Sequence, residues 1–94
     1  MNKELSPEYK LIPEHMLESI EGYVKYGYHL GGFLTAVFSN DLFKAVARGD
    51  DQNVALLRTY VRYITWKCPD GCHGSLETVN RWIQEKRTEN IDNV

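Results

Sequence analysis

The chain has 94 residues, with 11 lysines and arginines, 13 acidic residues and a formal net charge of −2. This length fits one domain over residues 1–94, and because so small a domain buries a modest share of its surface, we expect a homo-oligomer. The acidic balance argues against a nucleic-acid-binding face, and no apolar run approaches the roughly 18 residues of a membrane span, so we expect a cytoplasmic protein that contacts no membrane.

The first predicted helix follows an N-terminal arm. Residues 1–11 are polar, lack the apolar core of a secretory signal and carry no periodicity, so we expect an extended arm there. From Pro13 to Tyr26 the apolar residues recur at helical spacing. Proline suits the first turn of a helix, and Gly27 can end it because glycine accepts a positive φ without a Cβ penalty.

Two longer helices are predicted next, at 32–48 and 51–67. The first is apolar over more than half its circumference, which predicts burial on more than one side, in its own core and against a neighbouring copy. Gly49 is expected to end it, and Asp50 or Asp51 to cap the next helix. The inward stripe predicted for 51–67 consists of Leu57, Tyr60, Val61 and Ile64.

The last predicted helix follows a loop at 69–74. Ser75 is expected to cap this helix, and Val79, Trp82 and Ile83 to pack it down. The charged tail at 88–94 is expected to fray. No stretch shows the alternation of a strand, so the predicted fold class is all-α, a small four-helix domain.

The two cysteines, Cys68 and Cys72, are expected to remain thiols, with one or both packed inward beside a Pro-Asp-Gly turn. Two cysteines and a neighbouring His73 supply too few ligands for a closed zinc site. No nucleophile elbow frames any serine, and the adjacency of Cys72 and His73 does not make a nucleophile and a base. We therefore predict a protein that is not an enzyme and holds no metal or cofactor.

Several residues between positions 26 and 53 have ligand-binding chemistry. Gly31 and Gly32 offer backbone N–H groups to a ligand, or simply form a tight turn. Asn40, placed inside the predicted helix 32–48, either reads a ligand edge or makes a structural hydrogen bond, with Asn53 as a nearby candidate. Asp41 favours the structural alternative.

Aromatic and basic side chains complete the candidate set. Tyr26, Tyr28 and His29 are hard to bury together and suit stacking on a base, whereas Tyr23 and Phe33 are expected in the core. Arginines pair with phosphate through two parallel hydrogen bonds, so Arg48, Arg58 and Arg62 are candidates, the alternative being a solvated helix face.

The stretch from Ile12 to Asn53, with the later "CPDGCHGS" and "VNRWI", resembles a group of small proteins encoded by tailed bacteriophages. Their pattern is a helix that begins Ile-Pro, a glycine turn and the core G-x-F-L-x-A-V-x-x-N-D-L, followed by an acidic turn with Asn, a P-x-x-C-x-G-S loop and a last helix with Val and Trp-Ile. The resemblance covers roughly residues 12–84. Two departures are His73, where members often have Trp, and the turn before Gly31, where many have proline.

This resemblance implies a function by analogy with small helical phage proteins that act as sponges. Such proteins bind nucleotide signals of bacterial immunity, either cyclic oligonucleotides or ADP-ribose derivatives, and keep them from their effectors. The expectation is that this chain sequesters such a second messenger between subunits. The alternatives are an inhibitor or adaptor that binds a host protein, and a small DNA-binding regulator, against which the acidic balance counts.

Overall fold

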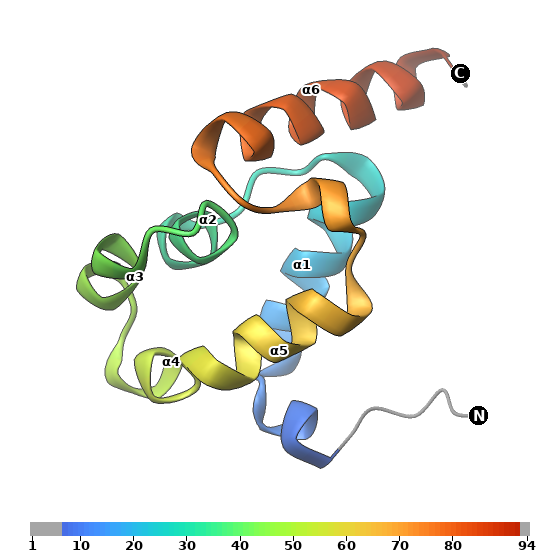
Figure 1. Ribbon diagram of the computed structural model, residues 1–94. Helices are drawn as coiled ribbons and strands as arrows, with labels where there is room; N and C mark the ends of the chain where they lie inside the picture. Colours follow the sequence, from blue (N-terminus) through green and yellow to red (C-terminus); the bar gives the residue numbers. More distant parts are fainter. Residues whose placement is uncertain (1–6, 93–94) are drawn as a thin grey trace.

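A computed structural model describes residues 7–92 (Figure 1). Every regular element in this range is helical, so the all-α prediction is confirmed, but the four predicted helices are six. None of the helices described is both long and apolar enough to cross a membrane. In chain order the elements are η1 (Pro7–Leu11), α1 (Glu14–Tyr26), α2 (Gly32–Phe38), α3 (Leu42–Arg48), α4 (Asp51–Ala55), α5 (Leu57–Lys67), η2 (Asp70–Cys72) and α6 (Leu76–Asp92), where η marks a 3₁₀ helix.

The contact between α1 and α6 is held by Tyr23, whose side chain is fully buried. Its hydroxyl donates a hydrogen bond to the Cys72 carbonyl at 2.7 Å, and its own carbonyl accepts one from the Trp82 indole N–H at 3.2 Å. Gly27 ends α1 with φ +73°, and an added Cβ there would lie 2.7 Å from the Ile83 carbonyl oxygen. The predicted glycine stop is therefore confirmed, and the same glycine lets α6 approach closely.

The prediction of one continuous helix at 32–48 is wrong, because Ser39, Asn40 and Asp41 divide this segment into α2 and α3. Asn40 takes φ +62°, in the left-handed region that asparagine tolerates better than most residues. Asp41 then caps α3, since its carboxylate accepts a hydrogen bond from the Lys44 N–H at 3.1 Å. The two residues therefore lie between helices, where their side chains favour a turn and a cap.

This break changes which side chains are buried. Phe33, Leu34 and Phe38 of α2 are buried in the core, but Leu42 and Val46 of α3 are exposed. Within one chain, the predicted burial on more than one side is therefore wrong for α3, of which only Ala45 is buried; burial of its outer face against a neighbouring copy stays a prediction. Figure 1 shows that α3 and α4 form an arc at one side of the molecule, and only the start of α6 comes near α3, where Leu76 borders a hollow with Lys44 and Arg48.

The helix predicted at 51–67 is also divided, at Leu56, into α4 and α5. Asp50 caps α4 by accepting the Asn53 N–H at 2.8 Å, which confirms one of the two predicted caps. In α5, Tyr60 and Ile64 are buried as predicted, but Val61 is half exposed. The inward stripe is therefore narrower than the sequence spacing suggested.

The two ends of the chain are more regular than expected. Residues 7–11 form η1 and bury Tyr9, so the extended arm is wrong for this part, while residues 1–6 lie outside the described residues. At the other end, α6 begins after Ser75, whose hydroxyl accepts the Thr78 N–H at 3.0 Å, as predicted. The helix continues to Asp92, and 93–94 lie outside the described range. The fraying predicted for 88–94 stays a prediction.

Candidate functional site

The last residue of α1 and the loop that follows it carry the aromatic candidates, and we call residues 26–29 the aromatic loop. Tyr26 and Tyr28 are both exposed, with ring centroids 5.3 Å apart and ring planes tilted by 35°. His29 is exposed too, and it lines a shallow groove with His15, Glu18, Ser19, Gly22 and Tyr28. The structure therefore brings the three predicted aromatic residues to one loop, with both tyrosine rings open to a planar ligand.

A second group of candidates meets where α2 begins. A Cβ added to Gly32 would lie 3.3 Å from Cδ of Arg48, so the arginine side chain crosses directly over the start of α2. Gly31 precedes it as the extended N-cap residue, with no atom within 4 Å of an added Cβ. Gly32 and Arg48 border a hollow of about 130 Å³ between α2 and α3, which we call the α2–α3 hollow. Its other lining residues are Thr35, Ala36, Ser39, Asp41, Lys44 and Leu76.

Ser39 and Lys44 of this hollow are residues that sequence reasoning missed. The Ser39 hydroxyl oxygen is buried and makes no hydrogen bond within residues 7–92. Lys44 lies on α3 one turn before Arg48, and both side chains are exposed. The i, i+4 spacing of the two basic residues would have been a usable signal, but only with the correct start of α3.

Two other candidates are already engaged within the chain. The Asn53 side-chain oxygen accepts the Tyr60 hydroxyl at 2.7 Å, which is a structural role. The Arg62 guanidinium lies 3.2 Å from the Glu8 carboxylate, so its charge is matched by η1. Burial raises the pKa of the Tyr60 hydroxyl to about 12, with a smaller contribution from the Asp50 carboxylate.

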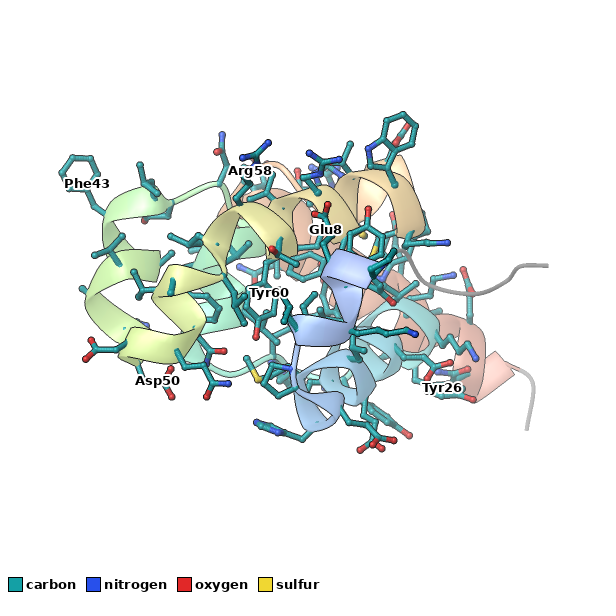
Figure 2. All side chains as sticks on the ribbon, turned by 90° about the horizontal axis from the view of Figure 1, so that it is seen from below. Glu8, Tyr26, Phe43, Asp50, Arg58 and Tyr60 are labelled. Carbon is teal, nitrogen blue, oxygen red and sulfur yellow. The ribbon has the colours of Figure 1, made fainter. Side chains whose placement is uncertain are left out.

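Asn40 and Arg58 lie near α5, away from the aromatic loop. Asn40 is exposed at the turn before α3 and borders two hollows, of about 70 and 240 Å³, that both reach Val61. Arg58 is exposed on α5 and makes no ion pair with any described residue. Figure 2 shows Arg58 and Tyr26 on opposite sides of the molecule, so no single pocket of one chain collects all ten candidates.

The two thiols of the cysteine loop have opposite pKa shifts, because their hydrogen bond lowers the pKa of the partly buried Cys68 thiol. Both cysteines are free thiols, and Cys72 is fully buried. Its hydrogen bond to Cys68, together with burial, raises the pKa of the Cys72 thiol well above its usual range. A buried thiol of raised pKa is a poor nucleophile. Among the residues described, no group of three or more His, Cys, Asp and Glu side chains has a metal-binding arrangement.

Comparison with protein-family models, with curated proteins and with solved structures finds no significant match to this chain.

Proposed function

We propose that this protein is a non-enzymatic binding protein that captures and sequesters a nucleotide-derived signal, either a cyclic oligonucleotide or an ADP-ribose derivative. The observation that carries the proposal is the exposed Tyr26–Tyr28 pair, in which the Tyr28 ring also packs against Gly22 of α1. Aromatic faces open to solvent bind bases by stacking, worth about 1–3 kcal/mol for each base. Cations on other surfaces, Arg48 and Arg58, supply the charge that a phosphate requires.

Assembly of several copies belongs to this proposal. Within one chain the aromatic loop and Arg58 lie on opposite sides, so one ligand can reach both only if two copies contribute. The exposed apolar side chains of α3, which are Leu42, Phe43 and Val46, offer an interface for such an assembly. The same assembly would add the core that a domain of this size lacks.

The proposed origin and setting follow from the sequence resemblance alone. A protein of the resembled phage group would work in the bacterial cytoplasm and protect the phage from a defence system that signals by nucleotides. Sequestration itself needs no catalytic group.

The decisive experiment is native mass spectrometry of the protein purified from bacteria that carry an active nucleotide-signalling defence system. We expect an oligomer with added mass of nucleotide size that is released on denaturation. Calorimetric titration of a panel of cyclic oligonucleotides and ADP-ribose derivatives then measures affinity. Tyr26→Ala should weaken binding at least tenfold. Tyr26→Phe, which keeps the ring, and Arg87→Ala, an exposed arginine on α6, serve as controls. Lack of binding across the panel would contradict the proposal.

A second candidate function, binding of a host protein, is favoured by the exposed side chains of α3 and α5. Phe43 is 86% exposed and Trp66 is 75% exposed, and Arg58 lies on the same edge as Phe43 in Figure 2. Leu42 of α3 and Val61 of α5 line one hollow, so the apolar surface is continuous between the two helices. Aromatic and arginine side chains dominate protein-binding surfaces. Affinity capture that depends on both Phe43 and Trp66, with no nucleotide bound, would favour this function.

A further inference from the structure

The α2–α3 hollow has an unusual chemistry for a surface depression. Lys44 and Arg48 reach it from successive turns of α3. Neither side chain makes an ion pair with a described residue. The only carboxylate in the lining is that of Asp41, and one of its oxygens accepts the Lys44 backbone N–H as the cap of α3. The lining therefore carries two positive charges against one negative charge and favours an anion.

A buried hydroxyl adds a directional group to this charge. The oxygen of Ser39 is shielded from solvent and finds no hydrogen-bond partner within residues 7–92. Buried polar groups are nearly always paired, so an unpaired one at the edge of a charged hollow requires a reason. Because the Ser39 oxygen is covered in this structure, its side chain has to rotate about χ1 to reach the hollow. The hydroxyl can then donate to a phosphate oxygen, and such a bond to a charged acceptor is stronger than one between neutral groups.

Gly32 explains how Arg48 comes to lie over the hollow. An added Cβ at Gly32 would lie 3.3 Å from Cδ of Arg48, which is closer than an ordinary van der Waals contact, and 3.6 Å from Nη1. The missing side chain thus lets the arginine cross the start of α2. The hollow, at about 130 Å³, has room for roughly four waters at their share of liquid volume, a size that suits one phosphate group.

From this arrangement we propose that the α2–α3 hollow binds a phosphate group, with Arg48 and Lys44 as its cations and the Ser39 hydroxyl as a hydrogen-bond donor. The inference rests on the proposed function for the identity of the molecule that carries the phosphate. Its test uses inorganic phosphate and pyrophosphate as probes, so that the phosphate site and nucleotide capture can fail separately.

The experiment is a titration of the ¹⁵N-labelled protein with pyrophosphate at low, constant ionic strength, followed by amide chemical shifts. Shifts are expected for residues 31–48 and should saturate. Arg48→Gln and Ser39→Ala should each raise the dissociation constant about tenfold, because each removes a hydrogen bond to a charged oxygen. Arg87→Gln is the matched control, an exposed arginine on α6 outside the hollow, and should change it less than twofold.

The outcomes separate the two proposals. Three results would overturn the phosphate site: shifts that do not saturate, shifts that spread over the whole surface, and a dissociation constant that is unchanged in Arg48→Gln. Nucleotide binding that is unaffected by Arg48→Gln would also overturn it while leaving sequestration intact. Saturable pyrophosphate binding by a protein that binds no nucleotide of the panel would support the phosphate site and contradict the proposed function.

Discussion

The α1–α6 half of the molecule and the α2–α4 segment are built in different ways. The first uses two long helices, joined through fully buried Tyr23 and its hydrogen bonds to Cys72 and Trp82. The second uses three helices of seven, seven and five residues, two of them opened by an aspartate cap. Long helices bury one continuous face, whereas short ones point in several directions and leave apolar and charged side chains outside.

This difference is the reason that the proposed phosphate site and the exposed α3 surface both lie in the segmented part. Both the α2–α3 hollow and the exposed α3 surface exist because the chain turns at Asn40 and Asp41. The α1–α6 half contributes the frame, together with the exposed tyrosine pair at its edge. The following variants test that division, beginning with the one of largest expected effect.

Replacing Tyr23 by alanine should damage the frame most. The change removes a fully buried ring that packs edge-on against Phe38 at 5.0 Å, and it leaves the Cys72 carbonyl unpaired. We expect a loss of about 3–5 kcal/mol in the free energy of unfolding, measured by urea denaturation. Tyr23→Phe keeps the ring and should lose about 1 kcal/mol. Equal losses in the two variants would contradict a core role for the ring.

Two glycines that flank the α1–α2 loop provide a sharper comparison. Gly27→Ala should destabilise the protein by about 3 kcal/mol, because the residue has φ +73° and its new Cβ would meet the Ile83 carbonyl oxygen. Gly31→Ala should be neutral within about 0.5 kcal/mol, since φ is −70° and the added Cβ meets open space. Thermal denaturation of both variants side by side tests the difference.

Alkaline pH should weaken the packing of α5 against its neighbours through Tyr60. The hydroxyl has a pKa of about 12 in the folded protein and about 10 when unfolded, so the protonated form is favoured by folding. Its contribution is complete below pH 10 and is lost as pH rises toward 12, by roughly 2–3 kcal/mol for the full shift. Tyr60→Phe should remove this part of the decline in stability between pH 10 and 12, as followed by circular dichroism.

A smaller loss than for Tyr23→Ala or Gly27→Ala is expected for the cap at the α2–α3 turn. Asp41→Ala removes the carboxylate that accepts the Lys44 N–H, and should cost about 1 kcal/mol. Asp41→Asn retains an acceptor and should cost less. If the two segments are as separate as proposed, Asp41→Ala will increase amide hydrogen exchange in α3 while leaving α1 and α6 unchanged. Uniformly faster exchange would show that the segment and the frame unfold together.

Part of this structure could be predicted from the sequence, because it depends on local interactions. The glycine stop at Gly27, the caps at Asp50 and Ser75, and the burial of Tyr60 and Ile64 depend on interactions within a few residues or on a clear periodic pattern. The breaks at 39–41 and Leu56 were missed because the apolar spacing continues across them. The candidate site could be predicted only in part for the same reason. The sequence indicated Gly32 and Arg48 as separate candidates, but their contact joins residues 16 positions apart on two different helices.

By itself, the sequence determined that the chain is helical and where α1, α2, α4 and α6 begin, and it predicted aromatic, glycine and arginine residues outside the core as ligand contacts. These properties follow from propensities, caps and spacing, which act over one or two turns. Only the tertiary structure decided that 32–48 bends at Asn40, that Asn53 and Arg62 are engaged within the chain, and that Lys44, Arg48 and Ser39 share one hollow. Such outcomes depend on which distant surfaces pack together, and packing between elements is not encoded in any single stretch of the chain.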